Sequence, residues 1–210
     1  MIQMSELPIR YGKVPLRVTR GHFATNHSHI NYYIDITFNK TRLSEAKETA
    51  RELVSHFINN TPVDTIICLD GTTAIGTWVG EELTRTGFHT INNHKTIYLV
   101  EPEYSGNALI FRDNLQQMIR GKHVLILMAS CTTGFTAKRA IEAITYYGGH
   151  VAGVAAVYRA VDEVEGYPVR SVYSTSDIPD YESYDYRDCP YCKKGIKLDA
   201  LVNSHGYSAL

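Results

Sequence analysis

The hydrophobic positions along the middle of the chain follow two alternating periods, and these periods predict its secondary structure. Between residues 43 and 58, apolar residues recur every three or four positions, which is typical of an amphipathic helix. The run DTIICL at 64–69 is short and β-branched, as in a buried strand, and residues 70–83 return to helical spacing after a turn. The same alternation predicts strands at 95–100, 123–128 and 150–158, and helices at 107–119 and 136–148.

This order of elements predicts the fold class. Strands that alternate with helices form βαβ units, so we expect an α/β fold whose open, mostly parallel sheet carries helices on both faces. The 210 residues are expected to form a single domain with its core at 41–165. Two less regular segments flank that core. Residues 1–40 carry aromatic and histidine residues without a long helix, and the C-terminal extension 166–210 is rich in Tyr, Asp and Pro.

Composition limits the classes of binding partner and the cellular compartment that we expect for the protein. Charged residues make up 20% of the chain and nearly cancel, leaving a net charge of -1, which argues against nucleic acid as a partner. No apolar run approaches the ~20 residues that span a bilayer, and the segment MIQMSELPIRYGK lacks the apolar core of a signal peptide. We therefore expect a cytoplasmic protein without membrane association. Its four cysteines are too few for a disulfide scaffold and are expected to be reduced.

Two loops that follow predicted strands carry the candidate chemistry. In an open parallel sheet, ligands bind beyond the carboxyl ends of the strands, where loops lead into helices. The segment VLILMASCTTGFTA at 124–137 runs from a strand through hydroxyl side chains and Gly134 into a helix, so backbone amides at the helix start can hold an anion. Asp70–Thr73 forms the second loop. Neither a P-loop nor a dinucleotide-binding glycine pattern occurs.

The segment 124–137 resembles the PRPP-binding loop of type I phosphoribosyltransferases. That loop has a hydrophobic strand, an acidic pair, two variable residues and then Thr-Thr-Gly-x-[Ser/Thr], which Thr132–Thr136 match. Three more segments resemble the orotate branch of the family in the matching order: GHFATNHSHINYYIDI at 21–36, DTIICLDGTTAIGTWVGEEL at 64–83 and CPYCKKGIKL at 189–198. The resemblance touches the whole chain.

The resemblance implies a fold, a reaction and a set of site residues. The fold would be that of type I phosphoribosyltransferases with a small N-terminal hood at 1–40. The reaction would be displacement of Mg²⁺-bound pyrophosphate from PRPP by a nitrogenous base such as orotate, in pyrimidine biosynthesis, by a homodimer. The residues implied for the 5′-phosphate are Ser130, Cys131, Thr132, Thr133, Gly134, Phe135 and Thr136, those for pyrophosphate are Asp70, Gly71, Thr72 and Thr73, and those of the base hood are Phe23, His27 and Ser28.

Two departures from the family pattern support an alternative function. Met128 and Ala129 stand where the family has the acidic pair that hydrogen-bonds the ribose hydroxyls. Each hydrogen bond to a charged acceptor contributes roughly 1.5 to 3 kcal/mol, so the loss of two weakens PRPP binding considerably. The segment EPEYSGNALIFRDN also has Glu101 and Glu103 where the family carries basic residues, and Arg112 is its only cation. The alternative is a non-catalytic sensor that binds PRPP or a nucleotide.

The cysteines and histidines allow more than one interpretation of their roles. Cys189 and Cys192 have the spacing of half a zinc site, and the other two ligands would come from a second subunit or from nearby histidines; a plain pair of thiols is the alternative. His22, His27 and His29 form the densest histidine cluster, which suits a metal, an anion or structural hydrogen bonds. Cys131 is expected to be exposed at a helix start with a lowered thiol pKa.

Overall fold

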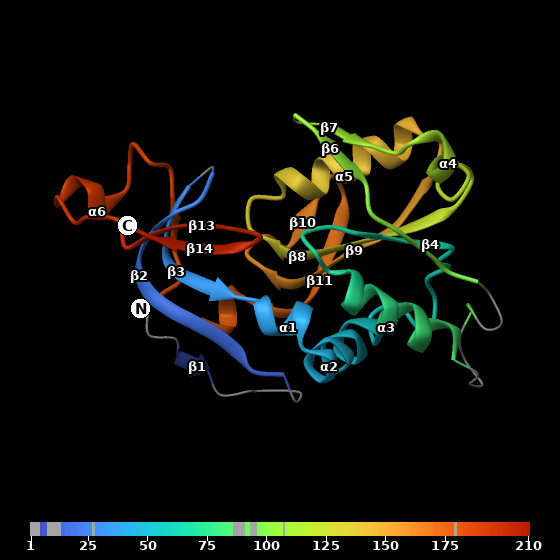
Figure 1. Cartoon of the computed structure of the whole chain (residues 1–210), viewed down its shortest axis with the longest axis horizontal. Helices are drawn as coiled ribbons and strands as arrows, with labels where there is room; N and C mark the ends of the chain where they lie inside the picture. The colour runs from blue at the N-terminus through green and yellow to red at the C-terminus, as the bar shows by residue number, and fades with distance from the viewer. Residues whose placement is uncertain are drawn as a thin grey trace.

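The computed structural model describes residues 5–7, 14–26, 28–85, 91–92, 96–106, 108–178 and 180–210, with only the backbone given for 5–7. Two sheets lie next to each other, and a short two-stranded hairpin lies apart from both (Figure 1). The larger helices surround one of these sheets, which we call the core sheet; the other sheet, which contains both early and late segments of the chain, we call the hood.

The core sheet has the order β10-β11-β9-β8-β4-β5, and all its strands are parallel except β10, which is antiparallel to β11. Its central strands β4 and β8 are buried almost throughout, because helices cover both faces and leave no polar side. The strands are β4 (Thr65–Cys68), β5 (Tyr98–Val100), β8 (His123–Cys131), β9 (His150–Arg159), β10 (Glu163–Val164) and β11 (Tyr167–Ser174).

Helices pack on the two faces of this sheet and divide its apolar core in two. Side chains that alternate along a strand point to opposite faces, so Leu125 and Leu127 of β8 contact one layer and Ile126 contacts the other. The first layer contains α2 (Leu43–Val54) and α3 (Thr73–Thr84), preceded by α1 (Thr37–Thr41). The second contains α5 (Phe135–Tyr146) and the short α4 (Asp113–Gln116). The predicted α/β fold class, with a mostly parallel sheet, is confirmed.

The hood is a mixed sheet with the order β12-β3-β2-β13-β14, and β1 also pairs with β2. Strand β13 runs parallel to β2, while the other pairs are antiparallel. A 3₁₀ turn at Thr175–Asp177 leads from the core sheet into this C-terminal part. Its elements are β1 (Ser5–Leu7), β2 (Leu16–Ala24), β3 (His29–Asp35), β12 (Ser183–Tyr184), α6 (Pro190–Lys193), β13 (Ala200–Asn203) and β14 (Gly206–Ala209).

The hood therefore draws on both ends of the sequence. The segment expected as a C-terminal extension at 166–210 is divided: β11 completes the core sheet, and β12, β13 and β14 join the hood. A buried ion pair attaches the hood to the core, since the guanidinium of Arg17 on β2 donates to both carboxylate oxygens of Glu45 on α2 at 2.7 and 3.0 Å.

One predicted element is wrong. The segment 107–119, expected as a helix, begins as strand β7 (Ala108–Ile110), which pairs with β6 (Glu103–Ser105), and only α4 is helical. Around β7 burial alternates, with Leu109 and Phe111 buried on either side of a more exposed Ile110, and Gly106 in the connecting turn has a φ of 57°. The apolar run was too short for its period to separate strand from helix. Among the described residues, no helix combines the length and apolar character that crossing a bilayer would require.

Candidate functional site

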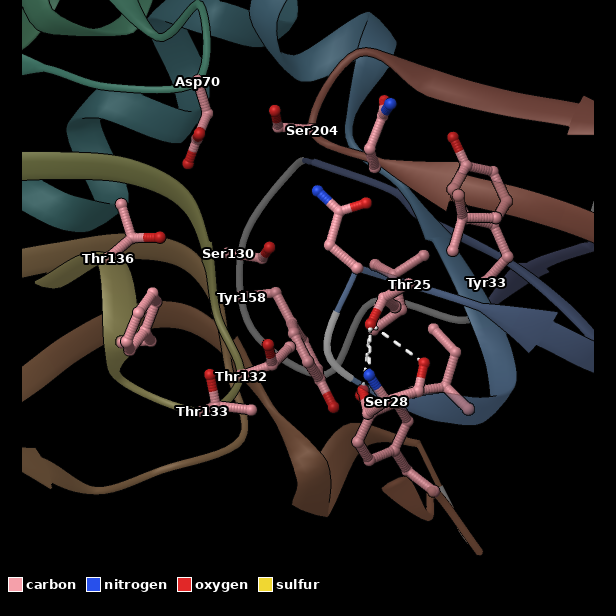
Figure 2. A pocket seen from close by; sticks show the side chains of 17 residues that line it. Thr25, Ser28, Tyr33, Asp70, Ser130, Thr132, Thr133, Thr136, Tyr158 and Ser204 are labelled. Atoms are coloured by element: carbon pink, nitrogen blue, oxygen red, sulfur yellow. Dashed lines mark hydrogen bonds between the residues drawn. The ribbon is translucent and has the colours of Figure 1, made fainter. Parts of the chain in front are cut away.

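A pocket of about 230 Å³ lies between the hood and the carboxyl ends of core strands β4, β8 and β9 (Figure 2). In Figure 2, the side chains of Asp70, Thr132, Thr133 and Thr136 lie across the pocket from those of Thr25, Ser28 and Tyr33. Its lining residues are Asp70, Ser130, Thr132, Thr133, Phe135, Thr136 and Tyr158 from the core, Thr25, Asn26, Ser28, Ile30, Tyr33, Ile34, Val202, Asn203 and Ser204 from the hood, and Tyr181 from the segment before β12.

The cradle, residues 130–136, forms one wall. Strand β8 ends at Cys131, and Gly134 turns the chain into α5 with a φ of 76°. A Cβ at Gly134 would lie 2.8 Å from a methyl carbon of Val164, so the turn requires glycine both for its conformation and for space. The first amides of α5 have no partner within the helix and carry its positive dipole end. This arrangement suits an anion.

Hydroxyl groups add to the cradle. Within the described chain, the side-chain hydroxyls of Thr132, Thr133 and Thr136 make no hydrogen bond, so they are free to donate to a ligand. Thr133 is exposed, and Thr132 and Thr136 are half-buried. Phe135 is 41% exposed, with the Arg139 guanidinium 3.7 Å above its ring. Ser130 lines the pocket although it is still part of β8.

The loop after β4 places a carboxylate in the same pocket. Asp70 and Gly71 have φ values of 56° and 74°, and these left-handed residues turn the chain toward α3. Burial raises the pKa of Asp70, an effect that the ammonium of Lys40 partly offsets. The Ala129 amide and the Ser204 hydroxyl also favour the charged form of the Asp70 carboxylate and so lower its pKa. Among the pocket-lining residues that the structure describes, Asp70 is the only one with a formally charged side chain.

The other residues of this loop have structural roles. The Thr72 hydroxyl is buried and donates to the carbonyl oxygens of Leu69 and Leu127 at 2.7 and 3.2 Å, which ties the loop to β8. The hydroxyl of Thr73 donates a hydrogen bond to the Glu101 carboxylate. Of the four predicted loop residues, only Asp70 lines the pocket described here.

Met128 and Ala129, at the positions of the family's acidic pair, point away from the pocket into the two apolar layers. Met128 is 2% exposed and packs on the α5 side, while Ala129 is 4% exposed and packs on the α2 side. The Ala129 contribution to the site is its backbone amide, which lowers the pKa of Asp70. The sequence showed that the acidic pair is missing and predicted Asp70 for the pyrophosphate loop. It did not show that the Asp70 carboxylate lies near the end of β8.

On the hood side, a tight turn presents polar groups to the pocket. The Thr25 hydroxyl accepts from the Ser28 amide and donates to the Ser28 carbonyl, both at 2.9 Å, so the β2–β3 connection closes on itself. Phe23, expected to contact a base, is 1% exposed and packs inside the hood against Tyr33. His27 lies outside the described residues.

Lys40 of α1 connects the two walls. Its ammonium donates to the carbonyl oxygen of Asp70 in the core at 2.8 Å and to that of Ser204 in the hood at 2.7 Å. Burial lowers the pKa of Lys40, while the negative charges of Asp70 and Asp35 raise it. The Lys40 ammonium is thus close to the pocket without lining it. Among the lining residues that the structure describes, the only charged side chain is the Asp70 carboxylate.

Two tyrosines belong to the pocket and were missed by sequence reasoning. Tyr158 and Tyr181 pack edge to face with ring centroids 5.6 Å apart, and in the described structure the hydroxyl of each is buried without a hydrogen-bond partner. Burial raises the pKa of Tyr181 to about 12, so its hydroxyl stays protonated near neutral pH. Tyr158 stands at the carboxyl end of a predicted strand, which was the available signal. Nothing in the local pattern indicated Tyr181.

The expectation for Cys131 is wrong. Its side chain is 1% exposed and packs in the apolar layer beneath α5, because β8 continues to this residue instead of ending before it. Burial raises the pKa of the Cys131 thiol to about 11. The thiol is therefore neutral near pH 7 and is no candidate for a nucleophile; only the Cys131 backbone belongs to the cradle.

The acidic segment after β5 forms an exposed ion pair. The guanidinium of Arg112 donates to both carboxylate oxygens of Glu103 at 2.6 and 2.7 Å. Its positive charge is therefore largely neutralised by a neighbour. Cys189 and Cys192 lie outside the pocket, in the hood, where the structure brings them together with His22 and His29.

Comparison with known proteins supports the resemblance predicted from the sequence. No protein-family model matches this chain. An orotate phosphoribosyltransferase from Caldanaerobacter subterraneus subsp. tengcongensis is 31% identical over 84 residues, which are 39% of this chain and 42% of that protein. The match thus spans less than half the length of the curated relative.

Solved structures show the fold. A phosphoribosyltransferase from Corynebacterium diphtheriae aligns with a TM-score of 0.51 and 21% identity, covering 77% of this chain and 90% of that one. An orotate phosphoribosyltransferase from Aeropyrum pernix aligns with a TM-score of 0.51 and 18% identity, covering 76% and 88%. UMP synthase of Leishmania donovani aligns with a TM-score of 0.55 and 18% identity, covering 85% of this chain and 36% of that one. The chain has the type I phosphoribosyltransferase fold, and the predicted resemblance to the orotate branch is confirmed.

Proposed function

We propose that the protein is a phosphoribosyltransferase that binds PRPP in the pocket between core and hood and transfers its phosphoribosyl group to a nitrogenous base, with release of pyrophosphate. The observation that carries the proposal is the position of the cradle. A helix N-terminus and three threonine hydroxyls face the same pocket as the polar turn of the hood, so a phosphate and a base can be held at opposite ends of one ligand.

The 5′-phosphate is assigned to the cradle. Backbone amides of Thr133 to Thr136 and the hydroxyls of Thr132, Thr133 and Thr136 donate to its oxygens, and Gly134 allows the close approach of the backbone. Ser130 adds a hydroxyl at the end of β8, and Cys131 contributes through its backbone alone. Such a site holds a phosphate mainly by dipoles and hydroxyls, so it can work although the described lining contains no basic side chain.

The pyrophosphate end is assigned to the loop Asp70–Thr73. Mg²⁺ prefers oxygen ligands and is bound through one or two carboxylates together with substrate phosphates. The half-buried Asp70 carboxylate at this end fits a Mg²⁺ ion that arrives with PRPP, and bound Mg²⁺ would neutralise charge on the departing pyrophosphate. We also assign to Asp70, which follows the neighbouring strand β4, the hydrogen bonds from ribose hydroxyls that the side chains of Met128 and Ala129 cannot accept.

The base is assigned to the hood end, with orotate as the first candidate by resemblance. Thr25 and Ser28 offer hydroxyl and backbone groups there, and His27 belongs to the same predicted set. Phe23 acts indirectly, since it packs beneath the hood sheet and supports the turn. A homodimer in the cytoplasm is part of the same proposal, on resemblance alone, and light scattering of the purified protein tests the dimer.

Isothermal titration calorimetry tests the binding step. The purified protein is titrated with PRPP in the presence of Mg²⁺, and separately with orotidine and uridine monophosphates. We expect saturable binding of at least one of these ligands, and weaker binding when Thr133 is changed to Val, which keeps the shape and removes the hydroxyl. Binding of none of the three would reject the proposal.

A second assay tests turnover. Pyrophosphate release is followed with PRPP, Mg²⁺ and, in turn, orotate, uracil, adenine and guanine. Release that depends on one base identifies the acceptor. Phosphate monoester analogues of PRPP that lack the pyrophosphate serve as the control, because they bind the cradle but have no leaving group.

A specific observation favours a second candidate function, a sensor that binds PRPP or a nucleotide without catalysis. Met128 and Ala129 are buried in the apolar layers, and Glu103 neutralises Arg112, the only cation of its segment. A departing polyanion would therefore meet little positive charge. Tight binding of PRPP without pyrophosphate release from any base would support the sensor, and steady turnover would reject it.

A further inference from the structure

Four side chains with the chemistry of metal ligands converge in the hood. The ligand atoms of His22, His29, Cys189 and Cys192 all lie within 4.8 Å of one another. His22 is near the end of β2 and His29 begins β3, while Cys189 immediately precedes α6 and Cys192 lies within it. The elements that carry them are more than 150 residues apart in sequence, as the 170 positions between His22 and Cys192 show. Cys189 is fully buried and Cys192 is exposed.

The three distances from His22 and the one between His29 and Cys192 match a tetrahedral zinc site. Zinc binds imidazole nitrogen at about 2.0 to 2.1 Å and thiolate sulfur at about 2.3 Å, so ligand atoms at the corners of a tetrahedron lie about 3.3 Å apart for two nitrogens and about 3.6 Å apart for nitrogen and sulfur. The Nε2 of His22 is 3.1 Å from the Nδ1 of His29. It is 3.4 Å from the Sγ of Cys189 and 3.7 Å from that of Cys192. The Sγ of Cys192 is 3.3 Å from the Nδ1 of His29.

Hydrogen bonding alone accounts poorly for this convergence. The Nδ1 of His22 lies 3.0 and 3.2 Å from the carbonyl oxygens of Ile196 and Lys197, and a carbonyl oxygen can only accept, so this nitrogen carries the proton. The Nε2 of His22 then has a single lone pair, yet three candidate donors surround it. A metal ion in the centre uses that lone pair and those of the other three ligands at once.

The surroundings have the features of an outer ligand shell. A metal-binding histidine commonly donates its second N–H to a carbonyl or carboxylate, which orients the ring, and His22 does so. The ring of Tyr191 stacks on that of His22 with centroids 5.1 Å apart and an interplanar angle of 22°. Asp199 accepts from the His22 backbone amide at 2.8 Å, which holds the strand in place. The imidazole is thus oriented at its Nδ1 edge and on one face, and the backbone that carries it is fixed.

The cysteine pair has the local geometry of a metal knuckle. Cys189 and Cys192 are separated by two residues, a common spacing of zinc ligands. The turn is closed by hydrogen bonds from the Lys193 amide to the Cys189 carbonyl at 3.1 Å and from the Gly195 amide to the Cys192 carbonyl at 2.9 Å. Gly195 has a φ of 70°, so the chain turns back sharply after the second cysteine.

We propose that His22, His29, Cys189 and Cys192 bind one structural Zn²⁺ ion that ties the β2–β3 hairpin to α6. All four positions of the tetrahedron are filled by protein side chains, which characterises structural sites and leaves no position for a reacting water. The assignment of Zn²⁺ follows from the two nitrogen and two sulfur ligands and from the agreement of these four distances with tetrahedral spacing. The site completes within one chain, so neither of the ligands expected from a second subunit is needed.

The ion would also organise the hood wall of the pocket, a consequence that rests on the proposed function. Thr25 and Ser28 lie on the β2–β3 connection between the two histidines, so the ion clamps both ends of the segment that faces the ligand. Loss of the ion is therefore expected to weaken ligand binding through the position of this turn, although none of the four proposed ligands of the ion lines the pocket.

Metal content of the purified full-length protein tests the proposal directly. We expect one Zn²⁺ per chain by elemental analysis. Replacement of the ion by Co²⁺ is expected to give thiolate-to-cobalt charge-transfer absorption in the near ultraviolet and strong visible bands typical of tetrahedral geometry. X-ray absorption at the zinc edge should resolve two sulfur and two nitrogen neighbours. Because none of these measurements involves PRPP, their outcome is independent of the proposed enzyme activity.

Matched variants locate the ligands. Cys192→Ser and His29→Gln are expected to reduce the zinc content severalfold and to remove or alter the cobalt spectrum. Cys68→Ala and His150→Gln change a cysteine and a histidine outside the cluster and should keep one ion per chain. The thermal midpoint of the wild type should fall in chelator, and that of Cys192→Ser should be insensitive to it.

Several results would overturn the proposal. One is wild-type protein with little zinc that also fails to bind Co²⁺ tetrahedrally after reduction and reconstitution. Iron in place of zinc would overturn the assignment of the ion, and a Cys189–Cys192 disulfide in the purified protein would overturn the site. These wild-type measurements keep the test decisive even if a ligand variant does not fold.

Discussion

The cradle and the hood line opposite sides of one pocket and are built in different ways. The cradle is one continuous stretch of seven residues, and its proposed binding groups are backbone amides and hydroxyls set by the turn at Gly134. The hood is held by contacts between distant segments, such as the parallel pairing of Phe23 with Ala200 and the bond from the His22 amide to Asp199, 177 positions apart. We therefore expect the cradle to be sensitive to local backbone changes and the hood to the loss of single long-range contacts.

The largest effect is expected where the hood is attached to the core. Glu45→Gln removes the charge that neutralises the buried Arg17 guanidinium, and breaking a buried ion pair from one side costs roughly 3 to 5 kcal/mol. The free energy of unfolding in urea measures the loss. Glu48→Gln is the matched control, because its pair with Arg51 is exposed and such pairs contribute about 0 to 1 kcal/mol. Equal losses in the two variants would contradict the attachment.

The same pair predicts a dependence on pH. The hydrogen bond from Arg17 lowers the pKa of Glu45 below its ordinary value. A carboxyl whose pKa is lowered in the folded state stabilises the protein above the ordinary pKa, and this contribution is lost as the pH falls through the lowered one. The difference in unfolding free energy between the wild type and Glu45→Gln should therefore shrink in acid. A difference that stays constant into acid would contradict it.

In the cradle, the strongest break is expected at Gly134. Gly134→Ala forces a side chain into a φ of 76° and brings its Cβ within 2.8 Å of Val164, so both strain and a clash disturb the turn. The left-handed conformation alone costs about 1 to 2 kcal/mol, and we expect PRPP affinity to fall at least about tenfold, equivalent to ~1.4 kcal/mol.

Gly121→Ala is the control for this variant. Gly121 has a φ of 69°, but nothing lies within 4 Å of its added Cβ, and it precedes the amino end of β8, whereas the pocket lies at the carboxyl end of that strand. It should show the conformational cost without the loss of affinity in calorimetry. An unchanged affinity of Gly134→Ala would mean that the cradle does not hold the phosphate.

A change at Asp70 is expected to separate stability from binding. Burial raises the pKa of Asp70, so ionisation of this carboxyl costs stability as the pH rises from its ordinary pKa through the raised one. Asp70→Asn should unfold at a higher temperature than the wild type at neutral pH, and the difference should vanish in acid, below the ordinary pKa. Asparagine also tolerates the φ of 56° at this position.

Binding should change in the opposite direction. The amide side chain of the Asp70→Asn variant offers no carboxylate to Mg²⁺ or to ribose hydroxyls. The variant should therefore lose more of the Mg²⁺-dependent binding of PRPP than of the binding of a nucleoside monophosphate without Mg²⁺. Calorimetry with and without Mg²⁺ measures both. An equal loss for the two ligands would remove Asp70 from the pyrophosphate end.

The smallest effect on stability is expected at Tyr158. Its hydroxyl is buried without a partner in the described structure, so Tyr158→Phe removes an unsatisfied group and should leave the unfolding free energy unchanged or raise it by up to about 1 kcal/mol. Tyr173→Phe is the matched comparison, because the Tyr173 hydroxyl donates to the Val14 carbonyl and its removal should cost roughly 1 to 3 kcal/mol. A large loss at Tyr158 would reveal a partner for its hydroxyl.

The sequence predicted the local half of the site well. The strand before Ser130, the turn at Gly134 and the helix after it follow one another in the chain, so composition and periodicity suffice to identify them. The sequence could not distinguish strand β7 from a helix, because its three residues are fewer than the residues of one helical turn. The end of β8 was also placed too early, and this error led to the expectation of an exposed Cys131.

The other half of the site depends on contacts that no local pattern contains. Tyr181 and Ser204 reach the pocket from segments that follow the core sheet, and the histidines that lie beside Cys189 and Cys192 come from the other end of the chain. The missing acid at Ala129 suggests that Ala129→Asp would restore a family site. In the fold, Ala129 is buried and its amide acts on the pKa of Asp70, so a second carboxylate there would repel the first and destabilise the protein.

The parallel pairing of β2 with β13 has a consequence for folding during synthesis. Residue 23 leaves the ribosome long before its partner at residue 200, and every strand of the core sheet is made in the interval. Strand β1 covers this edge of β2 at Leu16–Val18, but the stretch at Phe23 and Ala24 has no neighbour until β13 is made, and unpaired strand edges promote association between chains. The core can form its own contacts in the meantime. This side of the pocket is complete only when β13 has been made, so slow translation of the segment between β2 and β13 would lengthen the time for which this part of the β2 edge is unpaired.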